Sequence, residues 1–91
     1  MVVGTWKILD NPDCKLPQKL ASAYTDLLGS MLGAGYTPML YAATQLVAGT
    51  NHLIISKQTV VTKDPVEHLV YVIIYEDLDG KFSLTQINTI V

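Results

Sequence analysis

The sequence predicts an α+β fold in which one α-helix packs against a four- to five-stranded antiparallel β-sheet. Near the N-terminus, apolar residues recur at the spacing of a helix. The rest of the chain is a series of segments rich in Val, Ile, Thr and Tyr. The breaks between these segments are short, as in hairpins, so consecutive strands are expected to pair antiparallel. No linker or repeat interrupts the sequence, and residues 1–91 are expected to form a single domain.

The helix is expected to begin near Pro17, which suits a first helical turn because its missing N–H leaves no hydrogen bond unmade. The glycines of residues 33–35 indicate its end, since glycine accepts the left-handed backbone conformation of a helix C-terminus. Between these limits the apolar stripe comprises Leu16, Leu20, Ala23, Leu27 and Met31, widened by Tyr24, Leu28 and Leu32.

Strands are expected both before and after this helix in the sequence. A short first strand, residues 4–9, should end at the turn-forming residues 10–13. The later strands are expected at residues 36–47, 50–61, 67–75 and 82–91. Turns are expected at 48–49, 63–65 and 77–80, the last with an Asp-Gly pair that is typical of hairpins.

Composition and charge disfavour several classes of partner. Lys and Arg together number 6, are scattered and leave a net charge of −2, so no basic surface is expected to bind nucleic acid. The longest apolar run, residues 69–75, is far shorter than the ~20 residues that a membrane helix needs. The single cysteine, Cys14, allows no intramolecular disulfide, and residues 1–7 have no signal-peptide pattern. A cytoplasmic location is therefore expected, although a mature secreted chain would have the same features.

Catalytic and metal-binding roles are also disfavoured. Cys14 with His52 or His68 would supply a nucleophile and a base, but no Asn or Asp is placed in the sequence to orient either histidine. The two histidines lie on separate expected strands without further Cys or His ligands for a metal. The acids of residues 76–79 are read as a solvated hairpin tip, since a calcium loop needs more ligands. Neither enzymatic activity nor a metal or other cofactor is expected.

The most specific pattern is the segment Gln45-Leu46-Val47-Ala48-Gly49, at a junction of strand, turn and strand. It resembles the Gln-x-Val-x-Gly motif of the cystatin family of cysteine-protease inhibitors, and its continuation through residues 50–52 resembles the disulfide-free stefin branch. A glycine near the N-terminus, a helix before the motif and a second hairpin after it lie in the order of that family. The resemblance therefore covers essentially the whole chain.

The resemblance implies a cystatin-like fold and reversible, competitive inhibition of papain-like, cathepsin-type cysteine proteases. An N-terminal trunk and two hairpin loops would insert into the active-site cleft of the protease. The glycines would let the backbone turn away from the nucleophile and form a tight loop, and Gln45 would hold the loop shape. The implied protease-binding residues are Val2, Val3, Gly4, Gln45, Leu46, Val47, Ala48, Gly49 and Leu78.

Two alternatives stay open. The second hairpin reads Asp77-Leu78-Asp79 where many cystatins carry Pro-Trp, which favours a non-inhibitory binding or scaffolding module of the same architecture. A small enzyme of a related helix-on-sheet fold is disfavoured because the sequence shows no assembled acid–base pair. The resemblance also implies a monomer as the active form, and a domain-swapped homodimer formed by straightening the hinge at residues 46–49.

Overall fold

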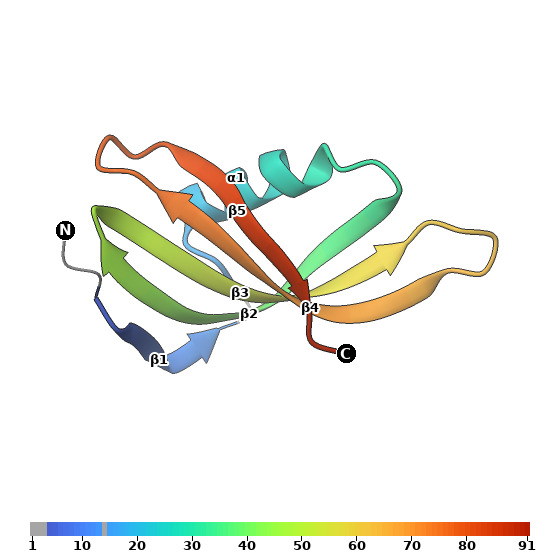
Figure 1. Cartoon of the computed structure of the whole chain (residues 1–91), viewed down its shortest axis with the longest axis horizontal. Coiled ribbons are helices and arrows are strands. Elements are labelled where there is room, and N and C mark those ends of the chain that lie inside the picture. The colour runs from blue at the N-terminus through green and yellow to red at the C-terminus, as the bar shows by residue number, and fades with distance from the viewer. Residues whose placement is uncertain (1–3, 14) are drawn as a thin grey trace.

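Five antiparallel strands follow one another in chain order across one sheet, and a helix packs on one of its faces (Figure 1). The computed structural model describes residues 4–13 and 15–91. Within them the elements are β1 (Trp6–Asp13), α1 (Gln18–Gly29), β2 (Ala34–Val47), β3 (Gly49–Val60), β4 (Val66–Glu76) and β5 (Phe82–Thr89). This confirms the predicted α+β, cystatin-like layout, with five strands in the sheet. No helix in the described residues is long and apolar enough to span a bilayer.

The core lies between α1 and the sheet. Residues spaced four apart on α1 present one apolar stripe to alternate residues of β3 and β4. Its buried members are Leu20, Tyr24, Leu28, Ile54, Val70, Val72 and Ile74. The one hydroxyl of the helix stripe is satisfied, because Tyr24 donates a hydrogen bond of 2.8 Å to Ser56 Oγ inside the core.

The C-terminal end of α1 differs from the prediction. The helix ends at Gly29, before the glycines that were expected to stop it. Ser30 Oγ donates to the Leu27 carbonyl at 3.0 Å and so offers the backbone a local alternative to another helical turn. Met31 and Leu32 therefore leave the apolar stripe, and 99% of Leu32 is exposed. Their predicted place in the helix was wrong because their spacing alone does not register this early stop.

The first strand and the start of the helix also differ from expectation. β1 continues through Asp13 instead of stopping before Asp10, but its pairing with β2 shifts register between Ile8 and Asp13. The turn-forming residues thus form an irregularity within an edge strand, where one side has no partner to lose. Pro17 is the residue preceding α1, with ψ of 146°, and its carbonyl accepts a hydrogen bond of 2.8 Å from the Ala21 N–H.

A bulge on β5 allows apolar residues that do not alternate regularly along the strand to face the core together. Thr85 is the extra residue opposite the step from Ile73 to Ile74, and its hydroxyl donates to the Ile73 carbonyl at 3.0 Å. The bulge brings Phe82, Leu84 and Ile87 to the same side of the strand, where all three pack against the core. A regular strand would have turned one of them to the opposite face.

The two ends of the sheet carry different connections (Figure 1). One end, called here the loop end, carries Gly4, the β2–β3 turn at Ala48 and the β4–β5 turn at residues 77–81. The other, the distal end, carries the β3–β4 turn at residues 61–65. The molecule is elongated along this direction, with extents of 46 × 25 × 24 Å.

Candidate functional site: the loop end of the sheet

The β2–β3 hairpin has a very tight turn. Val47 pairs directly with Gly49, which leaves Ala48 alone at the tip. Gly49 has a φ of 111°, a conformation that residues with a side chain rarely adopt. A Cβ at this position would overlap the Glu76 carbonyl oxygen and lie 3.0 Å from both Cε1 and the hydroxyl oxygen of Tyr75. The turn therefore requires glycine twice, for its backbone conformation and for the close approach of β4.

The tip of this hairpin is held from the neighbouring strand. The Tyr75 hydroxyl on β4 donates a hydrogen bond to the Ala48 carbonyl. The side chain of Leu46 stays outside these contacts and is 72% exposed, whereas Val47 is half-buried. The hairpin thus presents an exposed apolar side chain from a backbone that is fixed on both strands.

The N-terminal segment is joined to the hairpin through a side-chain relay. The Gly4 N–H donates to the Leu46 carbonyl at 2.9 Å, and Gln45 Nε2 donates to the Gly4 carbonyl at 3.0 Å. Asn51 Nδ2 donates to Gln45 Oε1, also at 3.0 Å. The side-chain amide of Gln45 on β2 therefore links Gly4, which precedes β1, to Asn51 on β3. A Cβ at Gly4 would lie 2.7 Å from the Leu46 carbonyl oxygen. The close approach of these two backbones depends on glycine.

The β4–β5 hairpin is organised by one aspartate. Asp77 Oδ1 accepts hydrogen bonds from the backbone N–H groups of Asp79 and Lys81, both at 2.9 Å. The Gly80 N–H donates to the Asp77 carbonyl at 3.0 Å, and the φ of 80° at Gly80 completes the turn. Leu78 stands at the tip with 82% of its surface exposed. The carboxylate of Asp77 is therefore turned into its own loop, and Asp79 is the exposed acid beside Leu78.

A buried polar chain lies beneath the two hairpins, across β2, β3 and β4. His52 is 8% exposed; its Nδ1 is 2.6 Å from the Tyr41 hydroxyl and its Nε2 is 3.0 Å from Glu76 Oε1. A neutral imidazole satisfies both contacts when Nε2–H donates to the carboxylate and Nδ1 accepts from the hydroxyl. Burial raises the pKa of the Tyr41 hydroxyl, and the charge of Glu76 raises it further. Tyr41 is thereby kept as a hydrogen-bond donor.

This polar chain includes a contact that the sequence did not indicate, because only Asn and Asp were considered there as partners of the histidines. Glu76 contacts His52, although the two residues are far apart along the sequence. The contact was missed because it depends on the register of β3 and β4, in which Thr50 faces Glu76 and His52 faces Ile74. Two cavities of about 420 and 660 Å³ border α1, and His52 lines neither of them. The polar chain connects Tyr41 of β2, His52 of β3 and Glu76 of β4 beneath the hairpins.

The other candidate side chains are dispersed. His68 lies near the C-terminal end, with Nδ1 3.3 Å from the Val91 carbonyl. Among residues 4–13 and 15–91, no three His, Cys, Asp or Glu side chains are grouped to hold a metal ion. Cys14, Val2 and Val3 lie outside the described residues.

The loop end brings together most of the residues that the sequence singled out. Gly4 and the segment 45–49 form one hydrogen-bonded unit, and Leu78 extends from the adjacent hairpin at the same end of the sheet (Figure 1). Glu76 joins the two hairpins, because its carbonyl packs against Gly49 and its strand leads into the second turn. Comparisons of the chain with protein-family models, curated proteins and solved structures found no match.

Proposed function

We propose that the loop end is a wedge that enters the active-site cleft of a papain-like, cathepsin-type cysteine protease and inhibits it reversibly and competitively. The observation that carries this proposal is the hydrogen-bonded unit of Gly4 and residues 45–49, in which Gln45 holds the N-terminal segment against the first hairpin. The wedge comprises Gly4, Gln45, Leu46, Val47, Ala48, Gly49 and Leu78, with Val2 and Val3 as the preceding trunk.

The fixed geometry of the loop end favours tight binding. A surface whose loops are already held loses little conformational freedom when it enters a cleft, so more of its contact energy becomes binding energy. Gln45, Tyr75 and Asp77 each hold one part of the loop end by side-chain hydrogen bonds. The backbone of the two hairpins therefore needs little rearrangement on binding.

Apolar side chains supply the energy of the proposed contact. Leu46 and Leu78 are 72% and 82% exposed in the free chain, so each has most of its surface available for burial. Full burial of one such side chain contributes about 1.5–3 kcal/mol. The contact requires no chemistry from the inhibitor, because occupying the subsites is enough to exclude substrate.

A titration of papain and a cathepsin with the purified chain tests the proposal. We expect loss of activity that is relieved by increasing substrate and reversed by dilution. Leu46→Glu should weaken inhibition at least tenfold, since it places a charge in an apolar contact. Leu32→Glu, at an even more exposed apolar position outside the loop end, is the control and should inhibit like the parent. Full protease activity at high micromolar concentrations of folded chain would reject the proposal.

The second hairpin favours one alternative, a non-inhibitory binding module that uses the same wedge. Leu78 is followed by the exposed Asp79, so an apolar tip and an acid are presented together. A partner with a basic rim around an apolar pocket would match this tip better than an acidic cleft. Asp79→Asn separates the two ideas: it should leave protease inhibition intact or improve it, but should weaken binding to such a partner.

A further inference from the structure

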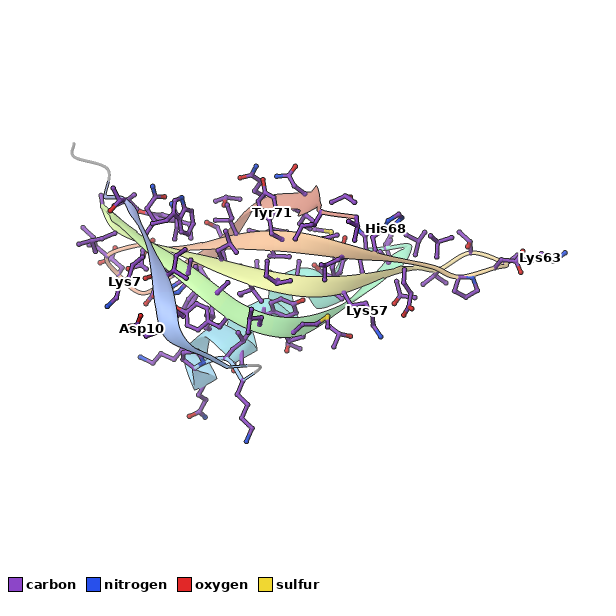
Figure 2. All side chains as sticks on the ribbon, turned by 90° about the horizontal axis from the view of Figure 1, so that it is seen from below. Lys7, Asp10, Lys57, Lys63, His68 and Tyr71 are labelled. Carbon is purple, nitrogen blue, oxygen red and sulfur yellow. The ribbon has the colours of Figure 1, made fainter. Side chains whose placement is uncertain are left out.

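The face of the sheet opposite α1, called here the outer face, is apolar across its centre. Antiparallel partners lie on the same face, and the register alternates with that of the helix-facing residues. Leu53 pairs with Ile73, Ile55 pairs with Tyr71, and Leu40 pairs with Ile55. Figure 2 views the sheet from the side opposite α1, with Tyr71 of β4 and Lys57 of β3 labelled.

The sequence of the central strands predicts cover on both faces. A strand with one solvent-exposed face alternates apolar and polar residues, whereas a strand covered on both faces is apolar without alternation. Segments 53–55 and 69–75 are apolar at nearly every position. In the described residues α1 covers one face only, so Ile54 and Val72 are 0% exposed while Leu53 and Ile73 stay half-buried.

The exposed area of the chain is large enough to supply an interface. Its accessible surface is 5982 Å² for a mass of 10.0 kDa. A compact monomer of that mass exposes about 5,240 Å², so the excess is about 740 Å². Each partner in a standard protein–protein interface buries about 800 Å². This excess, taken over the whole elongated chain, is comparable in size to the share that one copy contributes to such an interface.

Charge on the outer face permits self-association. Lys57 and Glu67 stand at its distal edge and neutralise each other, with 3.3 Å between Nζ and Oε2. On the β5 side, the Tyr71 hydroxyl accepts hydrogen bonds from Gln86 and Asn88 at 3.3 and 2.9 Å, which gives an uncharged polar rim. Two such faces placed together carry no like-charge repulsion at their centre, as a two-fold interface requires because each patch meets its own copy.

We propose that the outer face is the interface between two copies of this chain, packed sheet on sheet. Facing sheets of this kind pack about 10 Å apart, with their side chains interdigitating. The hairpin turns lie at the end of the strands and not at the centre of this face, so both loop ends stay free. The dimer differs in this respect from a domain-swapped one, in which the Ala48 turn is straightened.

Sedimentation equilibrium of the full chain between 1 and 200 µM, concentrations of the order used for weak to moderate dimers, tests this inference. We expect a dimer at the upper concentrations. The double variant Leu53→Thr/Ile73→Thr keeps residues that favour strands and should weaken dimerisation by about 100-fold or more, because each change occurs twice in the interface. Leu32→Glu, exposed but outside the face, should dimerise like the parent.

A second variant covers the case in which the double variant fails to fold. Ile55→Thr alone removes apolar contact at one position and keeps a β-branched residue, and circular dichroism with a urea melt establishes that it is folded. It should also weaken the dimer. A parent chain that stays monomeric at 200 µM, or a dimer that persists unchanged in folded outer-face variants, would overturn the inference. Neither result bears on protease inhibition, which is measured separately.

Discussion

The loop end and the distal end of the sheet are built from the same long strands but are held in different ways. At the loop end, side chains fix each connection: Gln45 holds the N-terminal segment, Tyr75 the first turn and Asp77 the second. At the distal end, the Thr62 hydroxyl donates to the Asp64 carbonyl at 2.7 Å within the turn, and the Val61 N–H donates to the Gly33 carbonyl at 2.9 Å. Gln45 and Tyr75 thus hold two connections of the loop end from neighbouring strands, whereas the turn at the distal end is held by a bond within the turn and a backbone bond to Gly33.

Exposed apolar residues do not distinguish the two ends. Leu46 and Leu78 are exposed at the loop end, but Val61 and Val66 are exposed at the distal end and Leu32 lies outside the core as well. Scattered apolar exposure is normal for a protein surface. The difference lies in the backbone beneath these residues, because a fixed backbone presents its side chains in one geometry. The comparison therefore favours the loop end as the site of the proposed recognition, on grounds of preorganisation.

The largest effect is expected from Gly49→Ala, compared with Gly33→Ala. Both glycines have positive φ, at 111° and 81°, but only a Cβ at Gly49 meets other atoms within 4 Å. We expect Gly33→Ala to lower the free energy of unfolding by roughly 1–2 kcal/mol. Gly49→Ala should lower it by roughly 3 kcal/mol or more and weaken inhibition about 100-fold. Urea melts and papain titrations of both variants measure this; equal losses would contradict the strand contact inferred at Gly49.

Leu78→Ser is expected to give the next largest effect on binding. Its side chain is 82% exposed in the free chain, so the unfolding free energy should change by less than about 0.5 kcal/mol. Inhibition should weaken about tenfold, from the loss of one apolar anchor. The matched control is Val61→Ser, which is 71% exposed at the distal end and should leave inhibition unchanged. A similar loss in both variants would mean that exposure alone governs binding.

Gln45→Ala is expected to affect geometry more than contact area. It removes the hydrogen bonds to Gly4 and from Asn51 and should lower the unfolding free energy by about 1–2 kcal/mol. Inhibition should weaken a few-fold, because the N-terminal segment is no longer held. Gln58→Ala loses one side-chain hydrogen bond to Tyr36 away from the loop end, and serves as the control. It should lose comparable stability without losing inhibition.

The smallest expected effect is a change of stability with pH that depends on Tyr24 and Tyr41 and appears only in alkaline solution. Burial raises the pKa of both hydroxyls above 10.0, and the Glu76 charge adds to the shift at Tyr41. Their protons are retained by the folded chain where the unfolded chain has lost them, so stability should fall as the pH rises past 10.0. Urea melts between pH 7 and pH 11 should show this fall, and Tyr41→Phe should reduce it. Simultaneous titration of all five tyrosines near pH 10, followed by ultraviolet absorbance, would contradict the burial argument.

Much of the fold followed from local periodicity, and the errors have local causes. Alternation and turn residues located all five strands, but turn residues did not end β1 because an edge strand accommodates them as an irregularity. The spacing of Met31 and Leu32 continued the helical pattern beyond the point where Ser30 closes the last turn. The spacing of apolar residues shows where a helix can continue, but it does not show a side-chain hydrogen bond, such as that of Ser30, that competes with the next helical turn.

Part of the candidate site could be predicted from the sequence and part could not. Gly4, Gln45 and Gly49 were selected from the sequence through a short motif, and each proves to occupy a position with a specific steric or hydrogen-bonding demand. The contact of His52 with Glu76 had no sequence signal, because it requires the register between two strands. Local motifs therefore identified the turns, while the polar chain beneath them emerged only from three-dimensional pairing.

In the β4–β5 hairpin, the residue that holds the turn is not one of the residues exposed at the tip, so the tip can be varied in sequence without changing the turn. Asp77 fixes the turn through the N–H groups of Asp79 and Lys81, and these bonds depend on backbone atoms at both positions. The side chains at residues 78 and 79 are thus free to be exchanged without removing an atom that holds the loop. A library randomised at these two positions, with Asp77 and Gly80 retained, would sample different recognition tips on an unchanged scaffold.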